Sequence, residues 1–351
     1  MKEFEDFPNG IEERSKSMKR MAWFIAGMIL LCWTASVHTA AASPYYEGKK
    51  ISIIVGFAPG GGHDRMARLL AKHLPKHIPG KPAFMVDNMV GATGMIAANH
   101  IYNLAKPDGF TIGTLHGGIF FAQLLKAEGV KFDLMKYSWI GSAASEASVL
   151  CIRSDMPYKT FDDLLKATSP IMLGTTGPAD VNGQFPILLK EFAGLNVKMI
   201  TYPSSSDIML AIERKEVDGR GASYSSIKPF IERGLVRPVV RCRVSEPGIE
   251  NLPVDEDLTK DKKGKTLMGM LLPAYRVARP YVAPPKTPPE VMTILRDAFA
   301  RLANDPELKE DAKKVMMNVD YLPSEECLKL VGYLLNQPED MVKEFNKYFK
   351  F

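Results

Sequence analysis

A glycine-rich turn between an apolar run and an amphipathic segment constrains this chain most, at residues 51–74. The run 51–55 is rich in β-branched residues and ends at a glycine, which predicts a strand buried on both faces. The glycines at 60–62 let the backbone turn sharply, and apolar residues over 66–74 recur at helical spacing. Such a turn leaves free N–H groups beside the positive end of the helix dipole, so the place suits an anion.

The spacing of this turn argues against two common anion sites. No lysine follows the glycines, so the turn is not a Walker A phosphate loop. Arg65 stands where the third glycine of a dinucleotide fingerprint would fall. A small carboxylate held mainly by backbone donors is one remaining interpretation. The other is a tight turn that binds no ligand, and the local sequence alone does not decide between them.

The first 42 residues have the pattern of a secretory signal peptide. Lys19 and Arg20 precede an apolar run over 21–33, and small residues follow up to Ala42. We expect cleavage after Ala42 and a periplasmic location, with Met18 as an alternative start of translation. The competing interpretation is an uncleaved membrane anchor, but the apolar run is shorter than the roughly 20 residues that a spanning helix needs.

The remaining chain, residues 43–351, is long enough for two modest domains. It keeps the whole formal net charge of +5, because residues 1–42 hold equal numbers of basic and acidic side chains. The basic residues are scattered, which argues against nucleic acid as a partner. Cys151, Cys242 and Cys327 lack partners at metal-ligand spacing, so we expect no metal and no cofactor. One disulfide is compatible with these cysteines but not required.

The chain continues as strands alternating with helices, which predicts an α/β fold with a largely parallel sheet. Ligands of such sheets bind beyond the carboxyl ends of the strands. His116 follows a predicted strand at 110–115, where it either contacts a ligand or has a structural role. A second strand–turn–helix unit begins with a strand at 171–175. Together with the glycine turn, it favours a hinged ligand cleft.

Other polar residues lie close to these turns in the sequence. Ser204 and Ser205 follow a predicted strand at 197–202, and they either donate to a ligand or cap the next helix. Arg220 is the cation nearest to the turns, and a guanidinium is able to pair bidentately with a carboxylate. A solvated surface position is the alternative for this arginine.

Six stretches in a fixed order give the chain a family resemblance. They are FAPGGGHDRMARLLAKHL, VDNMVGATGMIAAN, KPDGFTIGT, GTTGPA, EVDG and APPKTPPEVMTILRDAFARLANDPELKE. The chain resembles the Bug family, the extracytoplasmic solute receptors of tripartite tricarboxylate transporters. The resemblance implies a periplasmic-binding-protein fold, type II-like, in which two α/β domains joined by hinge strands close on a ligand. We place domain 1 at 43–146 plus 239–351 and domain 2 at 147–238.

The resemblance also implies where a ligand lies. One ligand loop would be 58–64 and a second 175–179, with backbone groups and waters holding a carboxylate. Asp64 would repel that ligand, so we expect it to cap the helix and hold the loop. Phe57 and Tyr224 are our hypothesis for an apolar wall toward an aromatic carboxylate. The expected ligand-binding residues are Phe57, Ala58, Pro59, Gly60, Gly61, Gly62, Asp64, His116, Thr175, Thr176, Gly177, Ala179, Ser204, Ser205 and Tyr224.

Two stretches depart from the family pattern. The residues 202–206 replace a glycine-rich turn, and the segment after Pro253 lacks the usual PTxxE motif. The identity of the carboxylate therefore does not transfer from better-known members of the family.

The predicted function is capture of a small carboxylate by a monomer whose two domains close like a Venus flytrap. The permease subunits of the transporter would then receive the ligand. Two alternatives stay open. A ligand-sensing subunit for a membrane signalling partner would use the same closure, and an enzyme acting on small acids would use a similar cleft. The sequence contains neither a GxSxG nor an HExxH motif, which argues against the enzyme.

Overall fold

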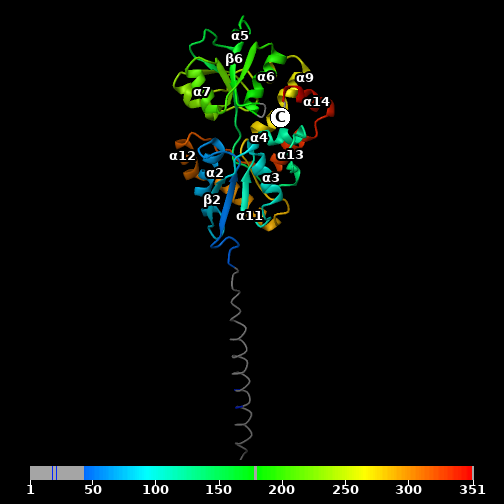
Figure 1. The fold of residues 1–351 in the computed structure, drawn as a ribbon. Coiled ribbons are helices and arrows are strands. Elements are labelled where there is room, and N and C mark those ends of the chain that lie inside the picture. The colour runs from blue at the N-terminus through cyan, green and yellow to red at the C-terminus, as the bar shows by residue number, and fades with distance from the viewer. Residues whose placement is uncertain (1–17, 19–20, 22–42, 178–179, 350–351) are drawn as a thin grey trace, which may run out of the picture. The chain divides into compact units, whose positions relative to one another are not determined.

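The computed structural model describes Met18, Met21 and residues 43–177 and 180–349 (Figure 1). The chain divides into two compact units after Pro44, and the fold described here belongs to the second unit. The predicted signal peptide and its cleavage site lie outside the described residues. Each helix within the described part is too short or too polar to cross a bilayer.

A six-stranded sheet forms the core of one part of the molecule, called lobe 1. In spatial order its strands are β11 (Leu322–Pro323), β4 (Ser138–Ser142), β10 (Pro280–Ala283), β3 (Thr111–Thr114), β1 (Lys50–Val55) and β2 (Ala83–Asn88). β1 pairs in parallel with β2 and β3, whereas β10 runs antiparallel to β3 and β4. β1 lies between β3 and β2 and not at an edge of the sheet, which fits its richness in β-branched residues.

Helices cover both faces of this sheet. Ile51 and Ile53 of β1 pack in one apolar cluster with α2 (Gly62–His73), α11 (Pro289–Leu302) and α12 (Pro306–Lys314). Ile54 packs on the opposite face with α3 (Met95–Asn103), α4 (Gly117–Leu124) and α13 (Ser324–Leu335). Three short 3₁₀ helices, η1 (Leu74–His77), η2 (Ala92–Gly94) and η3 (Leu134–Lys136), complete the connections. The prediction that the strand 51–55 is buried on both faces is therefore confirmed.

A five-stranded sheet forms the core of lobe 2. Its spatial order is β7 (Val197–Thr201), β6 (Ile171–Thr175), β8 (Gly219–Ser223), β5 (Ser148–Arg153) and β9 (Val236–Arg241). β6 is parallel to β7 and β8, and β5 runs antiparallel to β8 and β9. The helices of this lobe are α5 (Phe161–Leu164), α6 (Val181–Ala193), α7 (Ser205–Glu213) and α8 (Tyr224–Glu232). Figure 1 shows β6, α6 and α7 in lobe 2, and α2, β2 and α11 in lobe 1.

The last part of the chain contributes to both lobes. η4 (Asp255–Leu258) precedes α9 (Lys262–Gly269) and α10 (Leu272–Arg276), and α14 (Glu339–Tyr348) is the last described helix. α9 and α14 contact α6 of lobe 2, whereas α10 contacts α4 and α13 of lobe 1. β9 continues past residue 238 and pairs with β5 up to Arg241. The domain boundaries at 146/147 and 238/239 stay a prediction.

The three cysteines of the described part are free thiols. Cys151, Cys242 and Cys327 are all buried, so the disulfide that their number allowed does not form. Burial raises the pKa of each thiol, to about 12 for Cys242 and Cys327. A raised pKa keeps a thiol protonated and unreactive at neutral pH, so these cysteines act as small apolar side chains.

Candidate ligand-binding site

The glycine turn between β1 and α2 is held in shape by Asp64. The Gly60 N–H donates to Asp64 Oδ2 at 2.8 Å, and Asn88 Nδ2 donates to Asp64 Oδ1 at 2.9 Å and to the Phe57 carbonyl at 2.8 Å. Gly60 has a φ of +83°, which glycine adopts without strain. The predicted loop-holding role of Asp64 is confirmed, but its predicted role as the cap of α2 is wrong, because no side chain accepts a hydrogen bond as the cap of that helix and the Asp64 carboxylate is bonded to the turn.

Burial raises the pKa of Asp64, but hydrogen bonds from Arg68, Gly60 and Asn88 outweigh it and hold the pKa below its usual value. The carboxylate therefore stays ionised at neutral pH, and its oxygens accept hydrogen bonds from these donors. The N-cap of α2 is Gly61, which has no side chain to accept from the first turn. The N–H groups of that turn therefore remain available to an anion.

A group of aromatic rings stands beside this turn. Phe57 stacks on His63 with ring centroids 5.0 Å apart, and His116 lies 5.2 Å from Phe57 and 5.5 Å from His63. His116 is the N-cap of α4, and its Nδ1 accepts from the Gly118 N–H at 3.1 Å. The ring proton of the neutral form therefore sits on Nε2. Burial, followed by the charge of Arg279, lowers the pKa of His116 to about 4, so the ring is neutral at pH 7.

His116 also lines a cavity between the two lobes. The cavity has an empty volume of about 360 Å³, part of which is open to solvent. Its walls are His116, Gly117, Glu146, Ala147, Val181, Asn182, Ser223, Ala274, Tyr275, Ala278 and Arg279. Both interpretations of His116 therefore remain compatible with the structure, because it caps a helix and faces the cavity.

The charged residues of the cavity are an ion pair that sequence reasoning missed. Arg279 Nη2 lies 2.6 Å from Glu146 Oε1, and each side chain is about nine-tenths buried. Glu146 lies between β4 and β5, and Ser225 of α8 also donates to it at 3.2 Å. Arg279 Nη1 lies 3.4 Å from His63 Nε2. Arg279 Nη2 lies 2.9 Å from the position that a Cβ atom would occupy at Gly62. The available signal was that Arg279 is one of two arginines in the otherwise apolar stretch 270–285.

The second predicted loop uses its donors internally. Thr175 Oγ1 and the Thr176 N–H both donate to Asp180 Oδ2 at 3.1 Å, and the Gly177 N–H donates to Thr175 Oγ1 at 3.2 Å. Thr175 and Gly177 line a different pocket, beside α14. Ala179 lies outside the described residues. The cavity between the lobes is lined instead by Val181 and Asn182, the first two residues of the helix that follows this loop.

The two serines have separate roles. Ser204 is the N-cap of α7: its Oγ accepts from the Asp207 N–H at 3.2 Å and donates to the Asp207 carboxylate at 2.7 Å. Ser205 accepts from Arg220 through both its carbonyl and its hydroxyl oxygen. The capping interpretation of Ser204 is confirmed, and neither serine lines the cavity with His116.

Tyr224 is not brought together with Phe57. Its hydroxyl donates to the Pro247 carbonyl at 3.3 Å, and its ring lines a separate pocket between α8 and the segment 313–318. Phe57 lies beside His63 and His116 in lobe 1. The apolar wall that we expected these two rings to share is not present, because they face different spaces.

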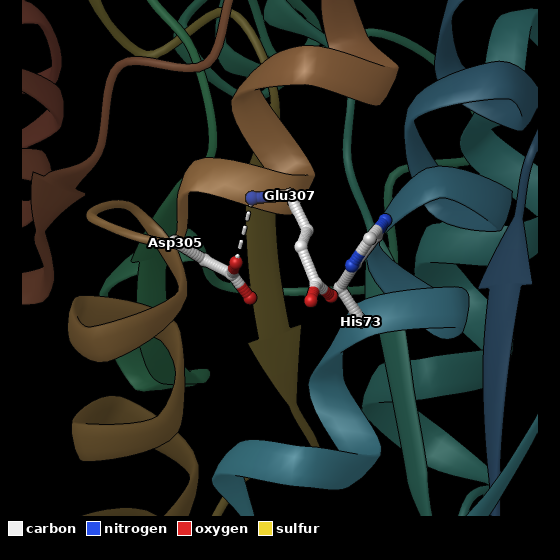
Figure 2. Close-up of side chains that lie close together, drawn as sticks. All are labelled: His73, Asp305 and Glu307. Atoms are coloured by element: carbon white, nitrogen blue, oxygen red, sulfur yellow. Dashed lines mark hydrogen bonds between the residues drawn. The ribbon is translucent and has the colours of Figure 1, made fainter.

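One cluster has the composition of a metal site. Ligand atoms of His73, Asp305 and Glu307 lie within 4.8 Å of one another, where α12 begins beside α2 (Figure 2). The Lys76 ammonium, however, lies 2.6 Å from both carboxylates, and His77 Nε2 lies 2.8 Å from Asp305. Because a cation of the chain already neutralises these acids, we interpret the cluster as a link between α2 and α12.

Several proteins are similar to this chain in sequence. A UPF0065 protein from the gbd 5' region of Cupriavidus necator is 23% identical over 92% of this chain and 96% of its own length. A UPF0065 protein of Agrobacterium vitis is 29% identical over 53% of this chain, which spans 55% of that relative. The protein BugT of Bordetella pertussis is 28% identical over 44% of this chain and 36% of its own length.

Solved structures have the same fold. A TctC solute-binding protein from Polaromonas has a TM-score of 0.68 at 19% identity, covering 86% of this chain and 99% of that one. The periplasmic binding protein BugD has a TM-score of 0.67 at 21% identity, and the match covers 86% of this chain and 98% of that one. The predicted type of fold, two α/β sheets with helices as in periplasmic binding proteins, is confirmed. The family model for tripartite tricarboxylate transporter family receptors matches residues 66–347. The chain therefore belongs to this family of solute-binding receptors, as its resemblance to the Bug proteins predicted.

Proposed function

We propose that this receptor works in the periplasm, where it binds a small carboxylate between its two lobes and delivers it to membrane permease subunits. The observation that carries the proposal is the cavity between the lobes, in a chain of this receptor family. No residue of the turn 58–64 lines the cavity, but Arg279 of its wall stands beside Gly62 and His63 at the open N-terminus of α2. The location further depends on the predicted export signal at 1–42.

A carboxylate fits the chemistry of this place. The first turn of α2 offers backbone N–H groups and the positive end of a helix dipole. The neutral His116 is able to donate one hydrogen bond from Nε2 without adding charge. Two solved relatives support this ligand class: MatC from Rhodopseudomonas palustris was solved with malate, and another R. palustris protein with adipate. Their TM-scores are 0.62 and 0.66, at 18% and 19% identity.

Closure of the lobes is the proposed mechanism. The cavity takes walls from both lobes, such as His116 of lobe 1 and Asn182 of lobe 2. A ligand that touches both walls binds the closed form more tightly than the open form, and this difference in affinity drives the closure. The permease would then recognise the closed receptor. The two charged side chains of the cavity, Arg279 and Glu146, are paired with each other.

The experiment is a thermal-shift screen of the purified protein against aliphatic, amino and aromatic carboxylates, followed by calorimetric titration of any hit. A ligand at 100 times its dissociation constant stabilises the native state by about 2.7 kcal/mol, which is readily measured. Absence of any shift, with the protein shown to be free of ligand, would refute carboxylate binding.

The variant Gly61→Asp tests the location of the site. Aspartate is a better N-cap than glycine, and the backbone at Gly61 has φ −71° and ψ 169°, so the fold should be stable. The carboxylate of the new aspartate would accept hydrogen bonds from these N–H groups of α2 and repel the anionic ligand, so we expect loss of binding. Pro338→Asp is the matched control, because it adds the same charge at the exposed N-cap of α14. If Gly61→Asp binds the ligand as tightly as Pro338→Asp and the wild type do, the ligand binds elsewhere.

A further inference from the structure

The wall of the cavity between the lobes carries one negative and one positive side chain. These are Glu146 and Arg279, which are 8% and 9% exposed. The other residues of the wall are uncharged, since His116 is neutral at pH 7. Burial of charge is costly, so a charged pair in the wall of a cavity either links parts of the fold or meets a ligand of matching charge.

The pair leaves hydrogen-bonding positions open on both of its members. Arg279 Nη2 and Ser225 Oγ both donate to Glu146 Oε1, and within the described residues no hydrogen bond to Glu146 ends on Oε2. A carboxylate accepts through both oxygens, so Oε2 remains for a further donor. Arg279 Nε is buried and has no hydrogen-bond partner in the described part of the chain. Because buried polar groups are normally hydrogen-bonded, these open positions point to a group from outside the chain.

Arg279 stands between Glu146 and the N-terminus of α2. Its Nη2 lies 2.6 Å from Glu146 Oε1 and 2.9 Å from the position that a Cβ atom would occupy at Gly62, the first residue of α2. A carboxylate at the open first turn of α2 would therefore also meet the guanidinium. The next charge beyond it is the negative charge of Glu146, which attracts an ammonium group and repels a second anion.

The surroundings of Glu146 hold its carboxylate in one position. Its backbone N–H donates to the Tyr275 carbonyl at 2.9 Å, and Ser225 of α8 holds Oε1 at 3.2 Å from the side of lobe 2. The ion pair with Arg279 holds the same oxygen from the side of lobe 1. A group that is fixed in this way recognises a ligand with little loss of its own conformational freedom.

We propose that the ligand is an α-amino acid and that Glu146 determines this preference by binding the ammonium group of the ligand. The carboxylate of the ligand would contact the first turn of α2 and Arg279. The inference rests on the proposed function, because it presumes that a carboxylate binds in this cavity. An α-amino acid carries both charges on one carbon atom, so they lie side by side as the charges of Arg279 and Glu146 do. Each charge would then face an opposite charge, and the contacts would be charge-assisted hydrogen bonds.

The test compares amino acids with α-hydroxy acids of the same carbon skeleton. L-Alanine, L-aspartate and L-phenylalanine are titrated by calorimetry into the purified protein beside L-lactate, L-malate and L-phenyllactate. The members of each pair differ in an ammonium group and a hydroxyl group. We expect an amino acid to bind at least roughly tenfold more tightly than its hydroxy acid, since a hydrogen bond between charged groups is stronger than one to a neutral group.

The outcomes separate this inference from the proposed function. Hydroxy acids that bind as tightly as their amino acids, or more tightly, overturn the inference while carboxylate binding stands. A receptor that binds other carboxylates but none of the amino acids overturns it in the same way. If no carboxylate of any class binds, the proposed function itself fails.

The variant Glu146→Gln assigns the preference to this residue. Glutamine keeps an oxygen that accepts from Arg279 and Ser225, and it removes the charge. We expect the variant to bind the amino acid and its hydroxy acid with similar affinities. A purely structural role of Glu146 would weaken the binding of both and keep their ratio, which would overturn the inference. Glu232→Gln is the matched control, because it removes the same charge at an exposed position of α8 in the separate pocket beside Tyr224, and it should keep the wild-type ratio.

A second measurement covers the case in which Glu146→Gln does not fold. With isotope-labelled glutamate in the wild type, the carbon NMR signal of the Glu146 carboxylate should shift more on addition of the amino acid than on addition of the hydroxy acid. Glu146→Asp keeps the charge and lacks this signal, so it provides the assignment. A signal that responds to neither ligand, or equally to both, would show that Glu146 only links the segments of the fold.

Discussion

Arg279 and Glu146 form an ion pair across 133 positions of sequence, with Nη2 and Oε1 2.6 Å apart in the wall of the cavity. Glu146 belongs to the segment that leads from β4 of lobe 1 to β5 of lobe 2. Arg279 precedes β10, and its backbone N–H donates to Ser142 Oγ at 3.1 Å. The pair therefore fixes the segment through which the two lobes are joined.

Removing one partner of this pair should destabilise the protein strongly. Glu146→Ala leaves the Arg279 guanidinium buried without a carboxylate, and we expect the free energy of unfolding to fall by about 3 to 5 kcal/mol. Urea titration of the purified protein measures the change. The double variant Glu146→Ala, Arg279→Met should recover part of the loss, because no unpaired charge remains. Additive losses in the double variant would show that the two residues stabilise the fold independently.

His116 should make stability depend on pH. Burial and Arg279 lower its pKa from 6.5 to about 4, so the unfolded chain binds more protons between these values. Stability should therefore fall as the pH falls from about 6.5 to about 4. His63 has a pKa lowered in the same direction, also mainly by burial, so the comparison must isolate His116. His116→Asn keeps an acceptor for the Gly118 N–H, and its unfolding free energy should decrease less over this pH interval. Parallel pH curves would contradict the prediction.

Asp305 should contribute to stability at neutral pH and lose that contribution in acid. Burial raises its pKa, but hydrogen bonds from Lys76, His77 and the Glu307 N–H outweigh this and hold the pKa well below 3.8. A depressed folded-state pKa means that stability is present above the unfolded value and is lost as the pH falls toward the folded value. Asp305→Asn keeps the helix cap but should show a flatter decline of unfolding free energy below pH 5. Asp162→Asn, at an exposed position, should follow the wild-type curve.

Gly221 should be intolerant of any side chain. A Cβ there would lie 1.9 Å from the Asn182 carbonyl oxygen, so Gly221→Ala must push the start of α6 away from β8. We expect a loss of at least about 1 kcal/mol of stability and weaker ligand binding, because Asn182 lines the cavity. Gly269→Ala is the matched control, since nothing stands within 4 Å of its Cβ position. Wild-type stability and affinity in Gly221→Ala would refute the close packing of α6 on β8.

The sequence predicted best what depends on local patterns. The alternation of strands and helices, the buried run 51–55 and the turn at Gly60 follow from β-branching, helical periodicity and glycine spacing. The loop-holding role of Asp64 also followed, because its charge would repel an anionic ligand.

What the sequence did not reveal depends on contacts between distant segments. Arg279 stands 133 positions from Glu146, and no local pattern shows that they meet. Thr175 was predicted to face a ligand, but its hydroxyl donates to the Asp180 carboxylate. Tyr224 shares lobe 2 with the second loop, and only the path of α8 shows that its ring turns toward the segment 313–318.

The open first turn of α2 has a consequence for how such receptors diverge. Its donors are backbone N–H groups, and no substitution except proline removes a backbone N–H. Substitutions can crowd or block this turn, but they leave the same kind of donor in place. Under the proposed function, the turn would offer an anion the same backbone donors in any variant without a proline there, and differences in ligand preference would arise from side chains of the cavity wall, such as Asn182 of lobe 2.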